Sequence, residues 1–140
     1  MTTVIDASIA LSWCFDDEAS DETDAVAQNV IANGGLVPSH FHLELANVLL
    51  QAERRGRISA SEIAQRLDLI AQMPLETDPQ TAGRAWNETL SLARTHKLTS
   101  YDAAYLELAC RKGAALATKD KALATAANHL GCLTVLGSKP

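Results

Sequence analysis

Short apolar runs alternate with longer segments of helical hydrophobic spacing along this chain. The runs of strand length cover residues 2–5, 36–37, 75–77, 115–117 and 133–136. Between them the spacing predicts helices over residues 20–32, 39–55, 59 or 61 to 72, 79–96, 101–112 and 119–130, and a short helix or turn over 7–14. Short apolar strands that alternate with helices form parallel sheets covered on both faces. The pattern therefore predicts an α/β fold, an α/β/α sandwich with a short-stranded parallel sheet.

Capping residues mark where some of these helices begin. Ser39 is placed to cap the helix over 39–55, and Thr99 or Ser100 to cap the helix that starts just after them. No Pro-, Gly- or Ser-rich tract and no internal repeat interrupts the sequence, so nothing in it indicates a linker. We expect residues 1–140 to form a single domain.

Four carboxylates lie close to the ends of the predicted strands. Asp6 follows the first strand, Glu44 lies in the helix after the second, and Asp102 lies near the start of the helix before the fourth. Asp120 stands two residues after Thr118, where the fourth strand ends. Because ligands of open α/β sheets bind beyond the carboxyl ends of the strands, we expect these acids to converge at one edge. Gathered carboxylates repel one another unless a divalent cation compensates them, and oxygen ligands without a His or Cys pair favour Mg²⁺ or Mn²⁺ over zinc.

Each of these acids also has a purely structural interpretation. Asp6 and Asp120 are well placed to cap the helices that follow them. Glu44 lies at the border of the apolar stripe of its helix, where an exposed side chain is the usual case. Asp102 stands over the apolar stripe of its own helix, so we expect it to point inward and to need a partner. One shared site explains all four positions together more economically than four separate structural roles.

Four sequence motifs carry a resemblance to a known family. They are V-I-D-A-S at residues 4–8, E-L-A-N-V-L at 44–49, L-T-S-Y-D-A-A-Y-L-E-L-A at 98–109 and L-A-T-K-D at 116–120. In this order, over the whole chain, they resemble the motifs of PIN-domain ribonucleases, specifically the VapC-type toxins of type II toxin–antitoxin systems. The resemblance implies a PIN-like fold and a Mg²⁺- or Mn²⁺-dependent endoribonuclease that leaves a 5′-phosphate and a 3′-hydroxyl on its RNA substrate. It also implies a homodimer that a VapB-type antitoxin neutralises in a heterotetramer or larger complex.

Carried over by position, the resemblance assigns the catalytic quartet to four acids: Asp6, Glu44, Asp102 and Asp120. We expect the three aspartates to hold the metal, Asp120 either directly or through a water, and the glutamate to act through a water or a second metal and as a base. Thr118 and Asn47 are candidates for orienting waters or carboxylates around the metal. Lys119 stands where such toxins often have a smaller or polar residue, so it bears on the charge of the pocket and on RNA preference.

The charges are unevenly distributed along the chain. A net charge of −5 argues against binding of nucleic acid by bulk attraction. Residues 1–53, however, carry nine acids and no base, and all twelve Lys and Arg residues lie from Arg54 onward. Such a chain could still accept RNA on one face, provided that a cation neutralises its acidic part. No segment is apolar enough to span a membrane and the N-terminus lacks signal-peptide features, so we expect a cytoplasmic protein.

Two further features bear on partners and on redox chemistry. The helix that begins at His40 has apolar residues on more than one side, which indicates either deep burial or cover by a partner. We expect an antitoxin to cover apolar surface near this helix. Cys14, Cys110 and Cys132 are odd in number and show no C-x-x-C spacing, so we expect three small buried side chains rather than a zinc site or a disulfide framework.

Two other functions remain open at this point. A phosphatase of the haloacid dehalogenase type also begins with an aspartate after the first strand, but Ser8 stands where that class requires a second aspartate. The other alternative is a PIN-like fold that only binds a protein. The presence of all four acids argues against it, and RNA cleavage with and without Mg²⁺ would separate the two.

Overall fold

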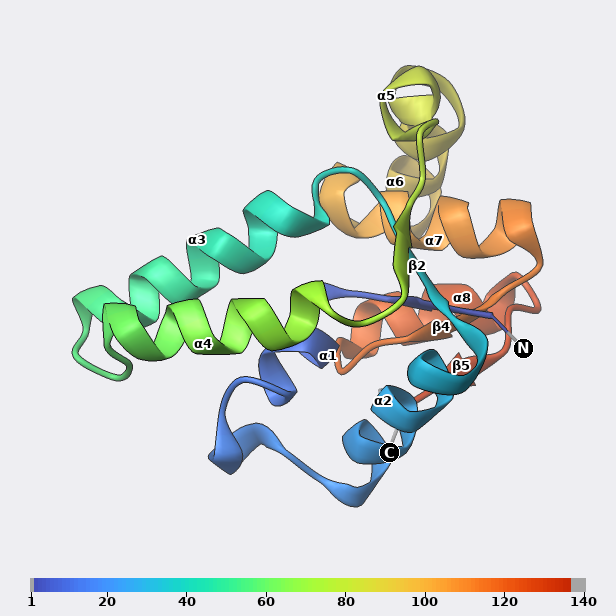
Figure 1. Ribbon diagram of the computed structural model, residues 1–140. Helices are drawn as coiled ribbons and strands as arrows, with labels where there is room; N and C mark the ends of the chain where they lie inside the picture. Colours follow the sequence, from blue (N-terminus) through green and yellow to red (C-terminus); the bar gives the residue numbers. More distant parts are fainter. Residues whose placement is uncertain (1, 137–140) are drawn as a thin grey trace.

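A parallel sheet of five short strands forms the centre of residues 2–136, the part of the chain that this computed structural model describes (Figure 1). The strands are β1 (Thr3–Ile5), β2 (Gly35–Val37), β3 (Leu75–Thr77), β4 (Ala115–Ala117) and β5 (Thr134–Val135). Their order is β3-β2-β1-β4-β5, and every neighbouring pair is parallel. The α/β fold predicted from the hydrophobic pattern is confirmed.

Helices flank the sheet in the predicted order. They are α1 (Ala7–Ser12), α2 (Asp21–Asn33), α3 (Phe41–Arg54), α4 (Ala60–Ala71), α5 (Thr81–Arg84), α6 (Leu90–His96), α7 (Ser100–Lys112) and α8 (Lys121–His129), with a 3₁₀ turn η1 (Asp16–Glu18) and a π-helical segment η2 (Ala85–Thr89). In Figure 1, α3 and α4 run side by side and extend away from the sheet, whereas α6 packs beside α7 and α5 lies beyond α6. None of the helices described has the length and apolarity needed to cross a membrane.

The core lies around β1, β4 and α7. All three residues of β1 and of β4 are buried, as expected for the inner strands of a sheet covered on both faces. Helix α7 packs against both strands, and its residues 103–109 are buried without interruption because α6, η2 and α8 pack around the helix as well. Tyr105 is the largest fully buried side chain. This packing fixes the position of Asp102, in the first turn of α7.

The start of α3 differs from the prediction. Its N-cap is His40 and not Ser39, and no side chain caps the helix there. The segment after Pro38 is already turned before the helix begins, with the Phe41 N–H donating to the Pro38 carbonyl. Ser39 therefore lies outside the helix, and its N–H donates instead to Thr81 Oγ1 at 3.0 Å. The cap of α7 is Thr99, one of the two residues predicted.

Two of the three cysteines also depart from the prediction. Cys14 is buried, but Cys110 is exposed and Cys132 is half-buried. Their Sγ atoms lie 3.0 Å apart. The uninterrupted burial of α7 ends at Ala109, so the next residue faces the segment that follows α8 at the molecular surface. Hydrophobic character alone could not show this pairing, because it depends on where two helices end.

Candidate active site

Asp6 lies directly after β1 and is only 6% exposed. Its Oδ1 accepts hydrogen bonds from Ser8 Oγ at 2.6 Å and from the Ile9 N–H at 3.1 Å, so the side chain caps α1. Its Oδ2 accepts the hydroxyl of the fully buried Thr118, at the end of β4. Burial raises the pKa of Asp6 above its usual value although these hydrogen bonds oppose it, and the charge of Glu44 raises it further.

Glu44 lies in the first turn of α3 and is half-buried. Its Oε1 accepts the hydroxyl of Tyr105, on α7, at 2.6 Å. Burial and this hydrogen bond raise the pKa of Tyr105, so the phenol stays protonated and remains a donor. The His40 ring lies 5.1 Å from the Tyr105 ring, and its Nε2 lies 3.1 Å from the carbonyl oxygen of Tyr101. These contacts join the start of α3 to the start of α7.

Asp102 is half-buried, and the charges of the other three acids all act on its carboxylate. Burial, and then the charges of Asp120, Glu44 and Asp6, raise the pKa of Asp102 to about 6. In the described part of the chain its carboxylate accepts no hydrogen bond, unlike the carboxylates of the other three acids. Its charge is therefore the least compensated of the four.

Asp120 follows β4 and is exposed. Its Oδ2 accepts the Leu123 N–H at 2.8 Å, which makes it the N-cap of α8, and its own N–H donates to Thr118 Oγ1 at 2.9 Å. In the same turn the Lys119 N–H donates to Ser8 Oγ at 2.9 Å. Hydrogen bonds thus link the turn that carries Asp120 to Ser8 and Thr118, the two residues whose hydroxyls donate to Asp6.

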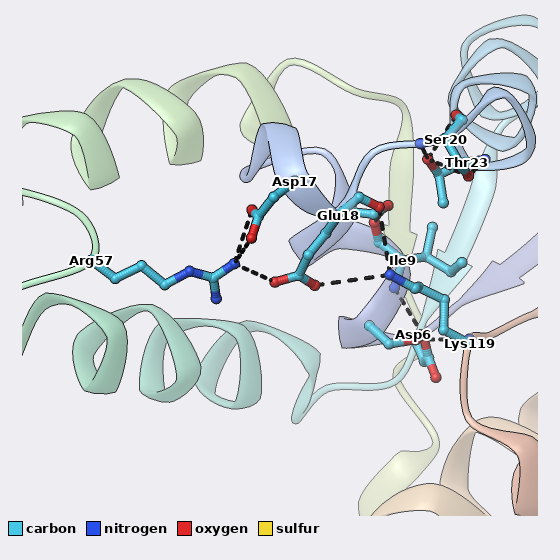
Figure 2. Close-up of polar contacts among 10 residues, drawn as sticks. Asp6, Ile9, Asp17, Glu18, Ser20, Thr23, Arg57 and Lys119 are labelled. Atoms are coloured by element: carbon cyan, nitrogen blue, oxygen red, sulfur yellow. Dashed lines mark hydrogen bonds and ion pairs between the residues drawn. The ribbon is translucent and has the colours of Figure 1, made fainter. Parts of the chain in front are cut away.

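The nearby cationic side chains are engaged elsewhere. Figure 2 shows Glu18 between two of them: Lys119 Nζ lies 3.9 Å from Glu18 Oε1, and Arg57 Nη2 lies 2.9 Å from Glu18 Oε2. Arg57 also pairs with Asp17 at 3.0 Å. Among residues 2–136 no Lys, Arg or His forms an ion pair with any acid of the quartet. Lys119 therefore pairs with Glu18 and not with the adjacent Asp120.

The structure brings the four predicted acids to one edge of the sheet, where their charges act on one another. Both helix-cap interpretations hold as well, because Asp6 and Asp120 are caps and members of the cluster at once. Asn47 is exposed, and within the described residues it makes no hydrogen bond to the quartet. Thr118, in contrast, bonds Asp6 directly.

In the arrangement that the structure describes, no group of three or more His, Cys, Asp or Glu side chains is close enough to hold a metal ion. Hydrogen bonds hold Asp6 and Asp120 in their capping positions, and like charges keep uncompensated carboxylates apart. The donor set itself fits a hard divalent cation, because the ligands are all oxygen and lack cationic partners. Burial first, and then the charges of neighbouring carboxylates, raise the pKa values of Asp6 and Asp102. A cation would require these side chains to draw together.

A family model described as "PIN domain" matches residues 3–128. The chain belongs to the PIN-domain family. All four acids lie within the matched residues. Ribonuclease VapC3 of Pyrobaculum aerophilum is 27% identical over 124 residues, covering 89% of this chain and 93% of that protein. Ribonuclease VapC3 of Mycobacterium tuberculosis is 28% identical over 125 residues, covering 88% of this chain and 85% of that protein.

Two solved structures share the fold of this chain. PAE2754 from Pyrobaculum aerophilum matches with a TM-score of 0.70 at 22% identity, over 96% of this chain and 90% of that one. FitAcB from Neisseria gonorrhoeae matches with a TM-score of 0.53 at 16% identity, over 95% and 96% of the two chains. The family resemblance predicted from the four motifs is confirmed.

Some residues of the site escaped the prediction. Tyr105 is not among the predicted site residues, yet a buried tyrosine needs a partner for its hydroxyl, and that requirement could have indicated the contact with Glu44. Ser8, the residue that argued against a phosphatase, serves instead to link Asp6 to the turn after β4. His40 is not among the predicted site residues, because its position beside Tyr105 depends on the packing of two helices.

Proposed function

We propose that this chain is a metal-dependent endoribonuclease that hydrolyses phosphodiester bonds of RNA and is the toxin of a toxin–antitoxin pair. One observation carries the proposal. Four carboxylates come from separate elements, the charges of three of them raise the pKa of the fourth, Asp102, and none of the four forms an ion pair within residues 2–136. Such an arrangement costs stability, and proteins maintain it where function requires it. The printed names of the VapC3 ribonucleases support the same activity.

Three of the acids would hold Mg²⁺ or Mn²⁺: Asp6, Asp102 and Asp120, the last directly or through a water. Bound there, the cation would supply positive charge beside the phosphate oxygens and favour the ionisation of water. Asp102, with its pKa of about 6, is mostly ionised at neutral pH and so available as a ligand, whereas protons compete for it in more acidic solution.

The remaining residues orient the acids and move a proton. Glu44 acts as the base. Because the Tyr105 hydroxyl occupies Oε1, the other carboxylate oxygen is left to accept a proton from the attacking water. Thr118 and Ser8 hold the two oxygens of Asp6 in fixed directions. Asn47 and Lys119 lie beside the site on exposed positions and would contact water or substrate.

The test is cleavage of a pool of structured RNAs by the purified protein in Mg²⁺, with the cut sites and the chemistry of the new ends mapped. We expect discrete cuts with 5′-phosphate ends, which EDTA abolishes and Mn²⁺ restores. Cleavage that continues undiminished in EDTA would overturn the metal mechanism. A folded protein that cuts no RNA in either metal would indicate the alternative, a PIN-domain module that only binds a protein.

We also propose that an antitoxin covers the groove between α3 and α4. This groove has a volume of about 430 Å³, and residues lining it include Phe41, Leu45 and Ile70. Leu43 and Leu69, on the same two helices, are 77% and 58% exposed, which is unusual for large apolar side chains. A VapB-type partner fits this surface if it has an apolar segment and a cationic side chain that reaches the acids and takes the place of the metal's charge.

Two measurements test these assembly proposals separately. Light scattering of the purified chain should give the mass of a homodimer, and a monomer at all concentrations would contradict that. Co-expression of the neighbouring reading frames should yield a heterotetramer or larger complex, whose formation Leu43→Asp weakens and Asp68→Asn, an exposed change on α4, leaves unaffected. Equal yields from both variants would place the antitoxin elsewhere.

A further inference from the structure

An open cleft of about 590 Å³ lies between the end of α6 and helix α8. Its lining carries cationic or hydrogen-bonding side chains and no carboxylate: Lys97, Lys121, His96, His129, Thr95 and Thr125. Two alanines complete the lining. The chain has a net charge of −5, so a cleft with two lysines and no acid differs in charge from the molecule as a whole.

The cleft begins where the candidate active site ends. Lys121 is the first residue of α8, directly after the N-cap Asp120. Lys97 ends α6 in a left-handed conformation (φ 56°), which turns the chain toward Thr99 and the start of α7. The two lysines of the cleft thus come from the segment that leads to Asp102 and from the residue that follows Asp120. Their charge is opposite to that of the acids.

We propose that this cleft binds the phosphates of a single-stranded RNA segment next to the scissile bond. The inference rests on the proposed ribonuclease function and names the path of its substrate. Lysine ammonium groups and threonine hydroxyls are the donors that contact phosphate oxygens, and a row of them follows a backbone without selecting a base. The acids repel that backbone, so the cationic cleft supplies the attraction that the quartet lacks.

The test compares two paired variants in a common Asp6→Asn background, which prevents cleavage. Binding of a labelled single-stranded RNA is followed by fluorescence anisotropy between 50 and 200 mM salt. We expect Lys97→Ala with Lys121→Ala to weaken binding about tenfold at the lower salt and to reduce the slope of log Kd against log salt by about 1.4, the value for two phosphate contacts on a single strand. Lys97→Arg with Lys121→Arg should bind like the background, because charge is kept.

Lys112→Ala is the matched control, since it removes an exposed lysine from the far end of α7. In the otherwise unchanged chain, the alanine pair should raise KM for RNA and leave kcat within about twofold, as expected for a loss of substrate binding alone. An alanine pair that binds RNA as tightly as Lys112→Ala overturns the proposal, while cleavage by the unchanged chain still supports a ribonuclease. Competition by inorganic phosphate as strong as by an RNA of equal phosphate content would assign the cleft to free phosphate and also overturn it.

A second inference rests on the thiols of Cys110 and Cys132, whose Sγ atoms lie 3.0 Å apart. A surface pocket of about 270 Å³ is lined by both residues. The two thiols join the last turn of α7 to the segment between α8 and β5. Burial and the contact with Cys132 raise the pKa of Cys110 to about 12.

We infer that this pair is a site of thiol–disulfide exchange with a small disulfide such as oxidised glutathione. One of the two thiolates attacks one sulfur of the reagent and expels a glutathione thiolate, which takes up the proton that the attacking thiol lost. The other thiolate then attacks the protein sulfur of this mixed disulfide and expels the second glutathione in the same way. The protein loses two electrons and two protons, and the reagent gains them.

Mass spectrometry of the whole chain after incubation with oxidised glutathione tests this inference. We expect a product lighter by two hydrogen atoms, with one of its three thiols still free after denaturation, and a higher melting temperature than that of the reduced chain. Cys14→Ser should give the same product with no free thiol, and Cys132→Ser should give none. A stable glutathione adduct, or a disulfide between two chains, would overturn the inference.

Discussion

Two clusters of acidic side chains in this protein differ in how their charge is compensated. In the first, Asp78 and Glu107 are 2% and 6% exposed, and both bind Arg111 through two hydrogen bonds each, the shortest at 2.6 Å. Arg84 adds an ion pair to Glu107 at 3.4 Å. Burial alone would raise the pKa of Asp78, but the hydrogen bonds and charge of Arg111 outweigh burial and lower it.

The quartet has no such partner. Asp6 is nearly as buried as Asp78, yet its pKa is raised, and the pKa of the half-buried Asp102 is raised to about 6. The chain places an arginine where acids hold β3 and α7 together, and none where acids meet at the edge of the sheet. The first cluster thus has its cationic partner within the chain, whereas the second lacks one among the described residues, as the proposed binding of a cation from outside requires.

The largest expected difference concerns activity. Asp6→Asn or Asp102→Asn should lower RNA cleavage about a thousandfold, or ~4 kcal/mol of barrier, because the nearly isosteric amide is a weaker ligand. Asp78→Asn should leave the rate per folded molecule unchanged. Single-turnover cleavage assays in Mg²⁺ measure all three variants. An equal loss of cleavage rate in Asp78→Asn would contradict the view that only the quartet serves catalysis.

Stability should show the reverse order. Arg111→Met leaves two buried carboxylates without their main partner, so we expect a loss of about 3 kcal/mol of unfolding free energy. Arg94→Met, at an exposed position on α6, is the control and should change little. Urea denaturation followed by circular dichroism gives both values. A loss below about 0.5 kcal/mol for Arg111→Met would mean that the first cluster is not structural.

Neutralising the quartet should stabilise the protein when no metal is present. In EDTA, Asp102→Asn should gain about 1–2 kcal/mol over the unchanged chain, a figure that allows for screening of the partly exposed carboxylate. Added Mg²⁺ should then raise the melting temperature of the unchanged chain more than that of the variant. A thermal-shift series over Mg²⁺ concentration tests this, with Asp68→Asn as an exposed control. Identical curves for all three proteins would show that the acids share no site.

The smallest expected effect is the change of stability with pH. A rise in pH should change the stability of the two clusters in opposite directions. The pKa of Asp102 is raised in the folded protein, so the protonated side chain stabilises the fold. This stabilisation is fully present below pH ~4, the pKa in the unfolded chain, and is lost as the pH rises through about 6, the pKa in the folded chain. The advantage of Asp102→Asn in EDTA should therefore grow by about 1 kcal/mol between pH 5 and pH 7.5. The lowered pKa of Asp78 has the opposite consequence, so the deficit of Asp78→Asn should stay constant over this range and shrink only below pH ~4. Parallel profiles for both variants would contradict the comparison.

The comparison also shows what the sequence alone could predict. Strand ends, helix order and the four acids follow from hydrophobic spacing and from motifs, because those features are local. Asp78 also stands directly after a strand, yet it is not among the residues considered from the sequence, and nothing there revealed Arg111 as its partner, 33 residues away. The contact between Cys110 and Cys132 and the hydroxyl bond from Tyr105 to Glu44 likewise depend on tertiary packing. Sequence position identified the acids, and only the structure showed which of them lack a cation.

Calorimetric titration with Mn²⁺ tests the central claim most directly, because it measures cation binding without RNA or an activity assay. The account predicts that the unchanged chain and Asp78→Asn bind Mn²⁺ with the same affinity, and that Asp102→Asn binds at least about tenfold more weakly. If the unchanged chain binds no Mn²⁺, or if Asp102→Asn binds it as tightly as Asp78→Asn does, then the four carboxylates do not form a metal site.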